Sequence, residues 1–188
     1  MSNRIRFFSI AVLTALSIYT SPAFSQSEPY ISGMYLGIGS VYGNSPQTVS
    51  YTTDLFFQTK TFFNPALDFR FGLIYGQDID QLSGENRTNR YYPFVKGASV
   101  QLTTEQYIMK NLFMEEGTGL LFLNDRTFSD VNTSGYGVLF SIALKVKLFE
   151  HLLKEKGFSV GVGTEYGLTF TNTLPGYYSV HILWMYTF

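Results

Sequence analysis

The sequence contains no cysteine, and charged residues make up only 14% of its 188 residues. The missing thiols exclude a disulfide-stapled scaffold and a zinc site built on thiolates. The 13 basic and 14 acidic side chains nearly balance, and no block of lysine or arginine offers a cationic face for nucleic acid. Beyond the N-terminal segment, no apolar run reaches the length of about 18 residues that a membrane-spanning helix needs. We also find no metal-binding constellation and no phosphate-binding loop, so the sequence predicts neither a metal site nor a cofactor.

The N-terminal segment has the composition of a secretory signal peptide. Residues 1–6 carry two arginines and no acid, and residues 7–19 form a short apolar run. Ala23 and Ser25 then supply small residues at the positions that precede a cleavage site. We therefore expect residues 1–25 to be removed on export, leaving a single domain over residues 26–188.

The sequence as a whole is unusually aromatic, with 18 Phe and 14 Tyr beside 17 Gly. After residue 25, its apolar residues alternate with small or polar ones. Period two is typical of β-strands, which place alternate side chains on opposite faces. It is clearest over residues 158–171, where large apolar side chains alternate with Gly, Ser, Glu and Thr. Residues 67–75 and 136–148 repeat the pattern, with Leu67 among the large apolar side chains.

Eight strands are expected, at about 30–43, 52–63, 66–76, 91–108, 112–123, 135–149, 157–171 and 177–188. In a soluble sandwich the glycine-rich polar faces would have to lie in water over long stretches. A membrane barrel instead places the large apolar residues in lipid and the small polar ones in a narrow lumen. The sequence thus predicts an all-β, eight-stranded, antiparallel transmembrane up-and-down β-barrel, with Lys96 as an exception on its lipid-facing side.

The connections alternate in length, as they do in outer-membrane barrels. Residues 43–51, 77–90 and 124–134 are long and polar, whereas 64–65 and 109–111 are tight. Two connections depart from this pattern: 171–176 is short for an external loop, and 150–156 is long and charged for an internal one.

The last residues resemble the C-terminal insertion signal of Gram-negative outer-membrane proteins. Trp184, Tyr186 and Phe188 share a face with apolar residues at alternate positions before them, and Phe188 is the final residue. The resemblance implies recognition by the outer-membrane assembly machinery and a location in the bacterial outer membrane. Lipid and lipopolysaccharide of that membrane are then the expected surroundings of a monomeric barrel.

Candidate chemistry is confined to a few polar side chains. His151 lies in the charged connection 150–156. His181 and Ser179 are expected to face the lumen, because they alternate with the outward residues of the last strand. A turn over 171–176 predicts that Glu165 lies opposite His181, so that Glu165, His181 and Ser179 converge in the pattern of an acyl-transfer triad. The alternative is a structural polar network that fills the barrel. We predict such a network from the side chains Asp68, Arg70, Lys145, Lys147 and Glu165.

Residues 107–188 also resemble the lipid A 3-O-deacylase family, through 117–122, Glu165-Tyr166 and the stretch from Thr169 to Asn172 that precedes Pro175-Gly176. The resemblance implies a barrel with an active site on its lipid-facing exterior. The family has a His-x-Ser-Asn motif near this stretch. Here Asn172 matches, but Thr169 and Thr171 occupy the histidine and serine positions, and residues 177–188 hold no glutamate.

We therefore predict a non-enzymatic outer-membrane barrel with a structural, adhesive or binding role through its external loops. A lipid A ester hydrolase of the deacylase type is the first alternative. A narrow pore or a conduit for a hydrophobic ligand is the second, although side chains fill the lumen of an eight-stranded barrel.

Overall fold

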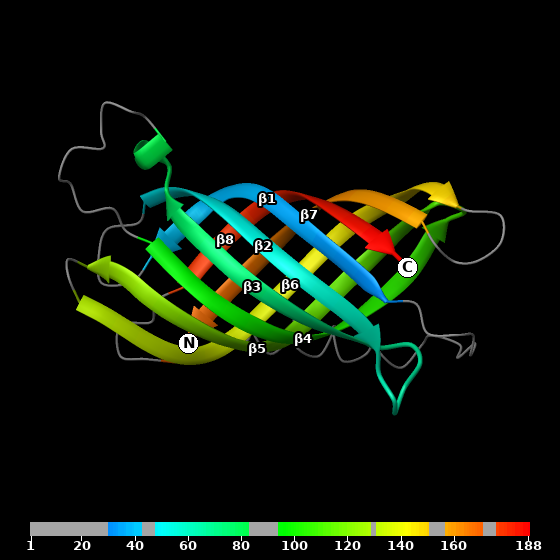
Figure 1. Ribbon diagram of the computed structural model, residues 1–188, viewed down its shortest axis with the longest axis horizontal. Helices are drawn as coiled ribbons and strands as arrows, with labels where there is room; N and C mark the ends of the chain where they lie inside the picture. Colours follow the sequence, from blue (N-terminus) through cyan, green and yellow to red (C-terminus); the bar gives the residue numbers. More distant parts are fainter. Residues whose placement is uncertain (1–29, 43–47, 83–93, 129–130, 151–156, 171–175) are drawn as a thin grey trace, which may run out of the picture.

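The computed structural model describes residues 30–42, 48–82, 94–128, 131–150, 157–170 and 176–188. Nearly all of them lie in eight strands (Figure 1): β1 (Ile31–Tyr42), β2 (Thr48–Lys60), β3 (Asp68–Asp78), β4 (Phe94–Met109), β5 (Leu112–Phe128), β6 (Val131–Glu150), β7 (Gly157–Thr169) and β8 (Gly176–Thr187). One short 3₁₀ helix, η1 (Ile79–Leu82), follows β3. Among the described residues, no helix is long and apolar enough to cross a membrane. The predicted signal peptide lies outside the described residues.

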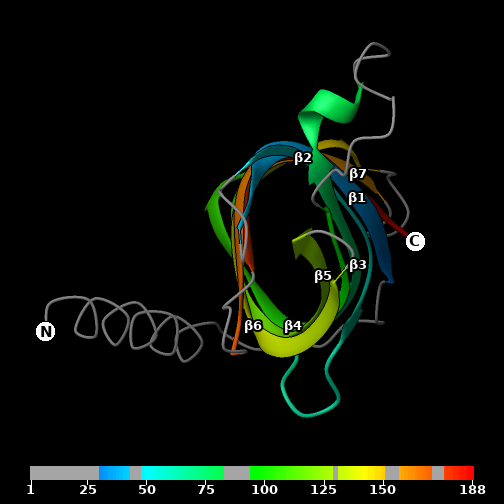
Figure 2. The same ribbon diagram turned by 90° about the vertical axis from the view of Figure 1, so that its left-hand side faces the viewer.

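The strands form a closed antiparallel barrel in which each strand pairs with its neighbours in the sequence. Strand β1 closes the ring against β8, with Ile31 opposite Thr187 and Tyr42 opposite Gly176. Figure 2 shows the closed ring from one end of the barrel. Closure gives every strand two partners, so that no sheet edge is left with unpaired backbone groups. The predicted fold is confirmed.

Alternation along the strands sorts the side chains as expected. In β7 the inward Ser159, Glu165 and Thr169 are buried, whereas the outward Val162 is 57% exposed. In β8 the inward Ser179 and His181 are buried, and the outward Tyr178, Val180 and Ile182 are exposed. The outer surface is therefore a broad apolar band, which matches the surface that lipid covers in membrane barrels.

The two ends of the barrel differ in their connections. One end, called here the loop end, carries η1 and the connections that follow β1, β3, β5 and β7, and lies at the left in Figure 1. The other end, called the terminus end, carries Tyr30, Phe188 and the connections that follow β2, β4 and β6. The backbone N–H of Phe188 donates a hydrogen bond of 2.8 Å to the carbonyl oxygen of Tyr30, so the two ends of the barrel chain meet there.

Two details of the connections correct the sequence prediction. The loop predicted over 124–134 is largely strand, because β5 and β6 pair as far as Phe128 and Val131. There Asn124 Nδ2 donates a hydrogen bond of 2.9 Å to Ser134 Oγ, so polar side chains extend the hairpin rather than end it.

The second correction concerns the first connection at the terminus end, which runs over 61–67 rather than 64–65. Leu67 was expected to point outward, but it is buried. Its backbone N–H donates to the carbonyl of Asn64 while the chain is still turning, so Leu67 precedes the alternation of β3.

The interior is less polar than predicted. A first cluster of buried apolar side chains near the loop end comprises Val41, Ile74, Val95, Leu121, Leu123, Leu139 and Tyr177. A second, nearer the terminus end, comprises Ile31, Tyr35, Phe56, Ala143, Leu183 and Met185. Small polar residues alone do not fill the lumen, because glycines leave room for large side chains, as Gly33 does for Phe56 and Gly167 does for Tyr177.

Candidate functional site

The three side chains predicted to converge, Glu165, His181 and Ser179, do lie in one buried layer of the lumen. Ser179 Oγ is 3.4 Å from His181 Nδ1 and 2.5 Å from Thr52 Oγ1. Glu165 lies on the neighbouring strand, and its carboxylate accepts hydrogen bonds from Tyr35 Oη and, at 3.4 Å, from Gln101 Nε2.

The register between β7 and β8 differs from the prediction by two residues. Glu165 is opposite Ser179, and His181 is opposite Gly163, because β8 already begins at Gly176. A shift of two leaves every side chain on its predicted face but changes its cross-strand partner. The expectation that Glu165 lies opposite His181 is therefore wrong.

Tyr35 occupies the place that a catalytic arrangement would need to leave open. Its ring stacks on the imidazole of His181 at a centroid distance of 3.9 Å, and its hydroxyl is bonded to Glu165. Glu165 thus bonds to Tyr35 and Gln101 within the described part of the chain, rather than orienting the imidazole. Ser179 has no exposed surface, so this arrangement packs and satisfies polar groups without an opening for a substrate.

A chain of ion pairs lies nearer the terminus end of the lumen. Glu115 accepts hydrogen bonds from Arg70 Nη2 and, at 2.7 Å, from Lys145 Nζ. Lys145 also pairs with Glu105, whose side chain is 24% exposed. These charges come from four strands, and each is bound by an opposite charge, as buried charges need to be.

The other residues of the predicted polar network lie at the same end. Asp68 accepts a hydrogen bond of 2.8 Å from Gln58 Nε2 and forms an ion pair of 2.8 Å with Lys60. Gln58 in turn accepts two hydrogen bonds from Arg70. Lys147 is placed differently, because its ammonium lies over the rings of Tyr107 and Phe113, at 5.9 and 5.6 Å from their centroids.

The apolar cluster near the loop end closes the lumen above these polar layers. We call it the apolar plug, with the seven residues given above. Leu123, Leu139, Val95 and Tyr177 have no exposed surface. Buried side chains therefore occupy the lumen both at the depth of the plug and at the depth of the ion pairs.

The remaining candidates divide between the lumen and the outer surface. Thr169 faces the lumen and is fully buried, although the corresponding residue of the deacylase family would face lipid. Thr171, Asn172 and His151 lie outside the described residues. Trp184, Tyr186 and Phe188 point outward as predicted, and no group of described His, Asp or Glu residues could hold a metal ion.

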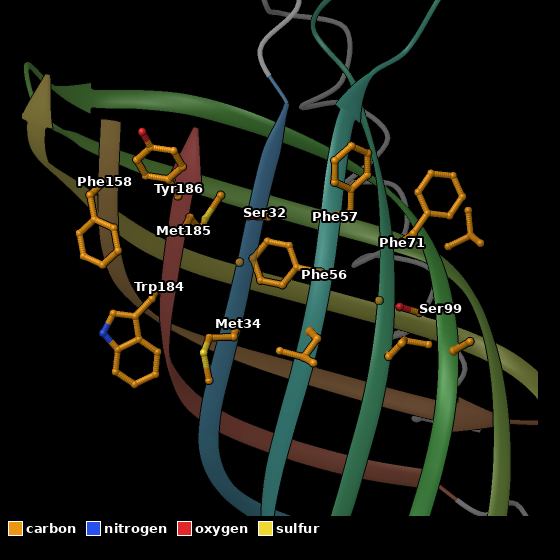
Figure 3. A pocket seen from close by; sticks show the side chains of 16 residues that line it. Ser32, Met34, Phe56, Phe57, Phe71, Ser99, Phe158, Trp184, Met185 and Tyr186 are labelled. Carbon is orange, nitrogen blue, oxygen red and sulfur yellow. The ribbon is translucent and has the colours of Figure 1, made fainter. Parts of the chain in front are cut away.

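A groove of about 800 Å³ lies on the wall formed by β7, β8, β1, β2, β3 and β4, and most of its lining side chains point outward. Ser32, Met34, Leu55, Leu73, Ala98 and Trp184 are among them. Figure 3 shows Trp184 and Phe158 at one end of the groove, and Phe57 and Phe71 toward the other. The lining is almost entirely apolar, so the groove fits a hydrocarbon rather than a polar ligand.

Sequence reasoning missed the groove because it depends on residues of six strands meeting in one register. The available signal was the small size of two outward residues. Ser32 lies between Phe57 and Tyr186, and Ala98 lies between Leu73 and Phe122. Each leaves a gap among large neighbours, but those neighbours are known only from the strand pairing.

Comparisons with known proteins support the fold. No protein-family model matches the chain, and no curated protein matches it. Among solved structures, it is similar to Neisserial surface protein A, with a TM-score of 0.60 and 6% identity over 87% of this chain and 100% of that one. It is also similar to Ail, the attachment invasion locus protein of Yersinia pestis, in complex with the heparin analogue sucrose octasulfate, with a TM-score of 0.53 and 12% identity over 86% of this chain and 100% of that one. Identities this low establish a common fold, the small outer-membrane barrel.

Proposed function

We propose that this protein is an integral outer-membrane barrel that neither conducts nor catalyses, and that acts as a membrane-anchored binding protein. Its apolar outer band, its closed ring of strands and its likeness to small outer-membrane barrels support the location. In this arrangement the loop end faces the outside of the cell. The outward row of Trp184, Tyr186 and Phe188 then serves as the signal that the assembly machinery recognises.

The filled lumen is the observation that carries this proposal. A pore needs a continuous polar path, but the apolar plug and the ion pairs of Arg70, Glu115 and Lys145 occupy the lumen at successive depths. A hydrolase needs an accessible nucleophile, whereas Ser179 is fully buried between Thr52 and His181. With a pore and a lumen hydrolase disfavoured, the remaining function is binding, at the loop end and on the lipid-facing surface. The similarity to Ail, solved with a heparin analogue, supports a binding role of this kind.

Three measurements test the proposal. Fractionation of the producing cells should recover the protein with outer membranes, and recovery in the soluble fraction would contradict the location. The purified protein in planar lipid bilayers should show conductance near zero, and regular channel steps would establish a pore instead.

The third measurement addresses the deacylase alternative. Mass spectrometry should give the same lipid A from cells with the gene, without it, and with the Ser179→Ala/His181→Ala variant as the matched control. Loss of one acyl chain only where the gene is present would establish the hydrolase. Loss that persists in the variant would place the active site outside the lumen.

A further inference from the structure

The groove crosses the outer wall of the barrel obliquely. At one end Trp184 lies three residues from the end of β8 at Thr187, which is the terminus end. At the other end Ala98 lies four residues from the start of β4 at Phe94, which is the loop end. The strands are tilted in the same sense (Figure 1), so a row of paired residues approaches the loop end as it passes from β8 to β4.

A cluster of rings and cations lies next to the Ala98 end of the groove. Lys96 is the next outward residue of β4 and is opposite Tyr75. Its ammonium lies 6.0 Å from the centroid of the Phe94 ring, and the guanidinium carbon of Arg126 lies 5.9 Å from the same centroid. The Phe94 ring also stacks on Tyr75, at a centroid distance of 6.4 Å. We call Tyr75, Phe94, Lys96 and Arg126 the cationic rim.

A hydrogen bond holds one ring of this rim, that of Tyr75, in place. The hydroxyls of Tyr51 and Tyr75 both donate to Gln77 Oε1, at 2.8 and 2.5 Å. Gln77 is buried between them although it belongs to the outward row. The rings of Tyr51 and Tyr75 are therefore held in place, whereas Lys96 remains exposed on the surface that otherwise faces hydrocarbon.

Two cations beside aromatic rings, at the depth where an outer-membrane barrel leaves the hydrocarbon, attract the phosphate of an anionic lipid. Lysine and arginine side chains lay their hydrocarbon stems against apolar surface and extend their charged groups toward the headgroups. From the cationic rim the apolar groove leads toward the middle of the bilayer, across four strand spacings or about 19 Å. That length accommodates a large part of one acyl chain within a hydrocarbon core about 30 Å thick.

We propose that the cationic rim and the groove together form a binding site for one anionic lipid of the outer leaflet. Lys96 and Arg126 bind its phosphate, and one acyl chain lies in the groove over Ala98 and Leu73 toward Trp184. The site rests on the proposed orientation of the barrel, with the loop end outward. It assigns a ligand to Lys96, the outward lysine of the described strands that a purely apolar lipid contact leaves unexplained.

The position of Trp184 allows a direct test, because it is the only tryptophan of the sequence. The protein is inserted with its loop end in a defined leaflet of phosphatidylcholine vesicles. The vesicles contain a small fraction of lipid that is brominated near the methyl end of its chain. The quantity measured is the quenching of Trp184 fluorescence by brominated phosphatidylglycerol, divided by the quenching by brominated phosphatidylcholine at the same mole fraction.

We expect this ratio to exceed unity for the unmodified protein and to fall toward unity in the Lys96→Gln/Arg126→Gln variant. Each cation near a membrane surface raises the local concentration of an anionic lipid about fivefold. Lys110→Gln removes one positive charge from the turn at the terminus end and is the control for a lost cation elsewhere, which should leave the ratio unchanged. A ratio of unity in the unmodified protein, or one insensitive to the double variant, would overturn the proposal.

The groove is tested separately by Ala98→Phe, which fills the gap between Leu73 and Phe122. We expect this variant to lower the ratio, whereas Ile142→Phe, on the outward face of β6, should not. A ratio lowered only by the charge variant would mean a headgroup site without a chain site. Displacement by inorganic phosphate alone, at constant ionic strength, would also reduce the site to a simple anion site.

The quenching ratio of Trp184 is independent of the conductance and lipid A measurements. A barrel that conducts, or one that deacylates lipid A, overturns the proposed function but leaves the quenching ratio free to support the lipid site. Conversely, a ratio of unity in a silent, inactive barrel removes the lipid site alone. Unheated gel mobility of each variant shows whether the barrel has folded.

Discussion

At the scale of single residues, buried charge in the lumen is the strongest constraint. Glu115 is 2% exposed and bonds to both Arg70 and Lys145. The cost of burying these charges is offset only while all of them remain paired. Glu165 is held differently, by Tyr35 and Gln101 from two other strands. These buried charged side chains are thus stabilised by their partners in the lumen, and this explains their presence without a reaction.

Glu115→Gln should lower the free energy of unfolding by about 3 kcal/mol, because it leaves two buried cations with a neutral partner. Guanidinium unfolding in lipid vesicles, followed by Trp184 fluorescence, measures the change. Glu105→Gln is the matched control, because Glu105 is the other carboxylate that pairs with Lys145. The Glu105 side chain is partly exposed, so its loss should cost less than about 1 kcal/mol. Equal losses for the two variants would contradict this account of the ion pairs.

At the scale of strands, close contact between neighbours decides where side chains fit. A Cβ atom at Gly39 of β1 would lie 1.8 Å from the carbonyl oxygen of Tyr178 on β8. Backbone cannot move aside without opening the seam at which the barrel closes. At Gly76 of β3 the nearest atoms are instead methyl groups of Val95, Thr52 and Val41, at 3.3–3.4 Å.

Gly39→Ala should therefore destabilise the barrel by about 1–3 kcal/mol, the usual cost of overpacking. Gly76→Ala should change stability by no more than about 0.5 kcal/mol, because only side chains need to adjust. The same unfolding measurement compares the two variants. If Gly76→Ala proved the more damaging, the seam between β1 and β8 would not be as closely packed as described.

At the scale of the whole molecule, the barrel has an apolar outer surface where a soluble protein has a polar one. Exposed Leu, Ile, Val and Phe side chains cover its outer surface, and charged side chains are buried within it. Such a molecule is stable only where hydrocarbon covers the outer band. The filled lumen and the cationic rim extend the same arrangement, since they leave the loop end and the lipid-facing groove as the surfaces available for binding.

The position of the bilayer can be tested on one strand and one face. Ile142→Lys, in the middle of the outward row of β6, should destabilise the inserted barrel by about 2–4 kcal/mol, whereas Tyr136→Lys near the loop end should cost about 0–1 kcal/mol. Reversible unfolding from vesicles measures both variants. Similar costs at the two positions would mean that Ile142 does not lie near the middle of the bilayer.

Much of this molecule follows from the sequence alone. Period two in residues 158–170 and 176–188 decides which side chains point outward, and the abundance of apolar outward residues predicts lipid around them. These inferences depend on local geometry, so a two-residue error in the register of β7 and β8 did not affect them. The sequence also marks Lys96 as an exception on the outer face.

Tertiary structure alone decided which of these residues meet. Arg70 bonds to Glu115 across 45 positions of the chain, and Tyr35 bonds to Glu165 across 130. The plug, the groove and the cationic rim likewise combine residues from several strands. Such contacts depend on the register and curvature of the closed barrel, which arise from the packing of all eight strands together. A two-residue change in pairing preserves every face but replaces every neighbour.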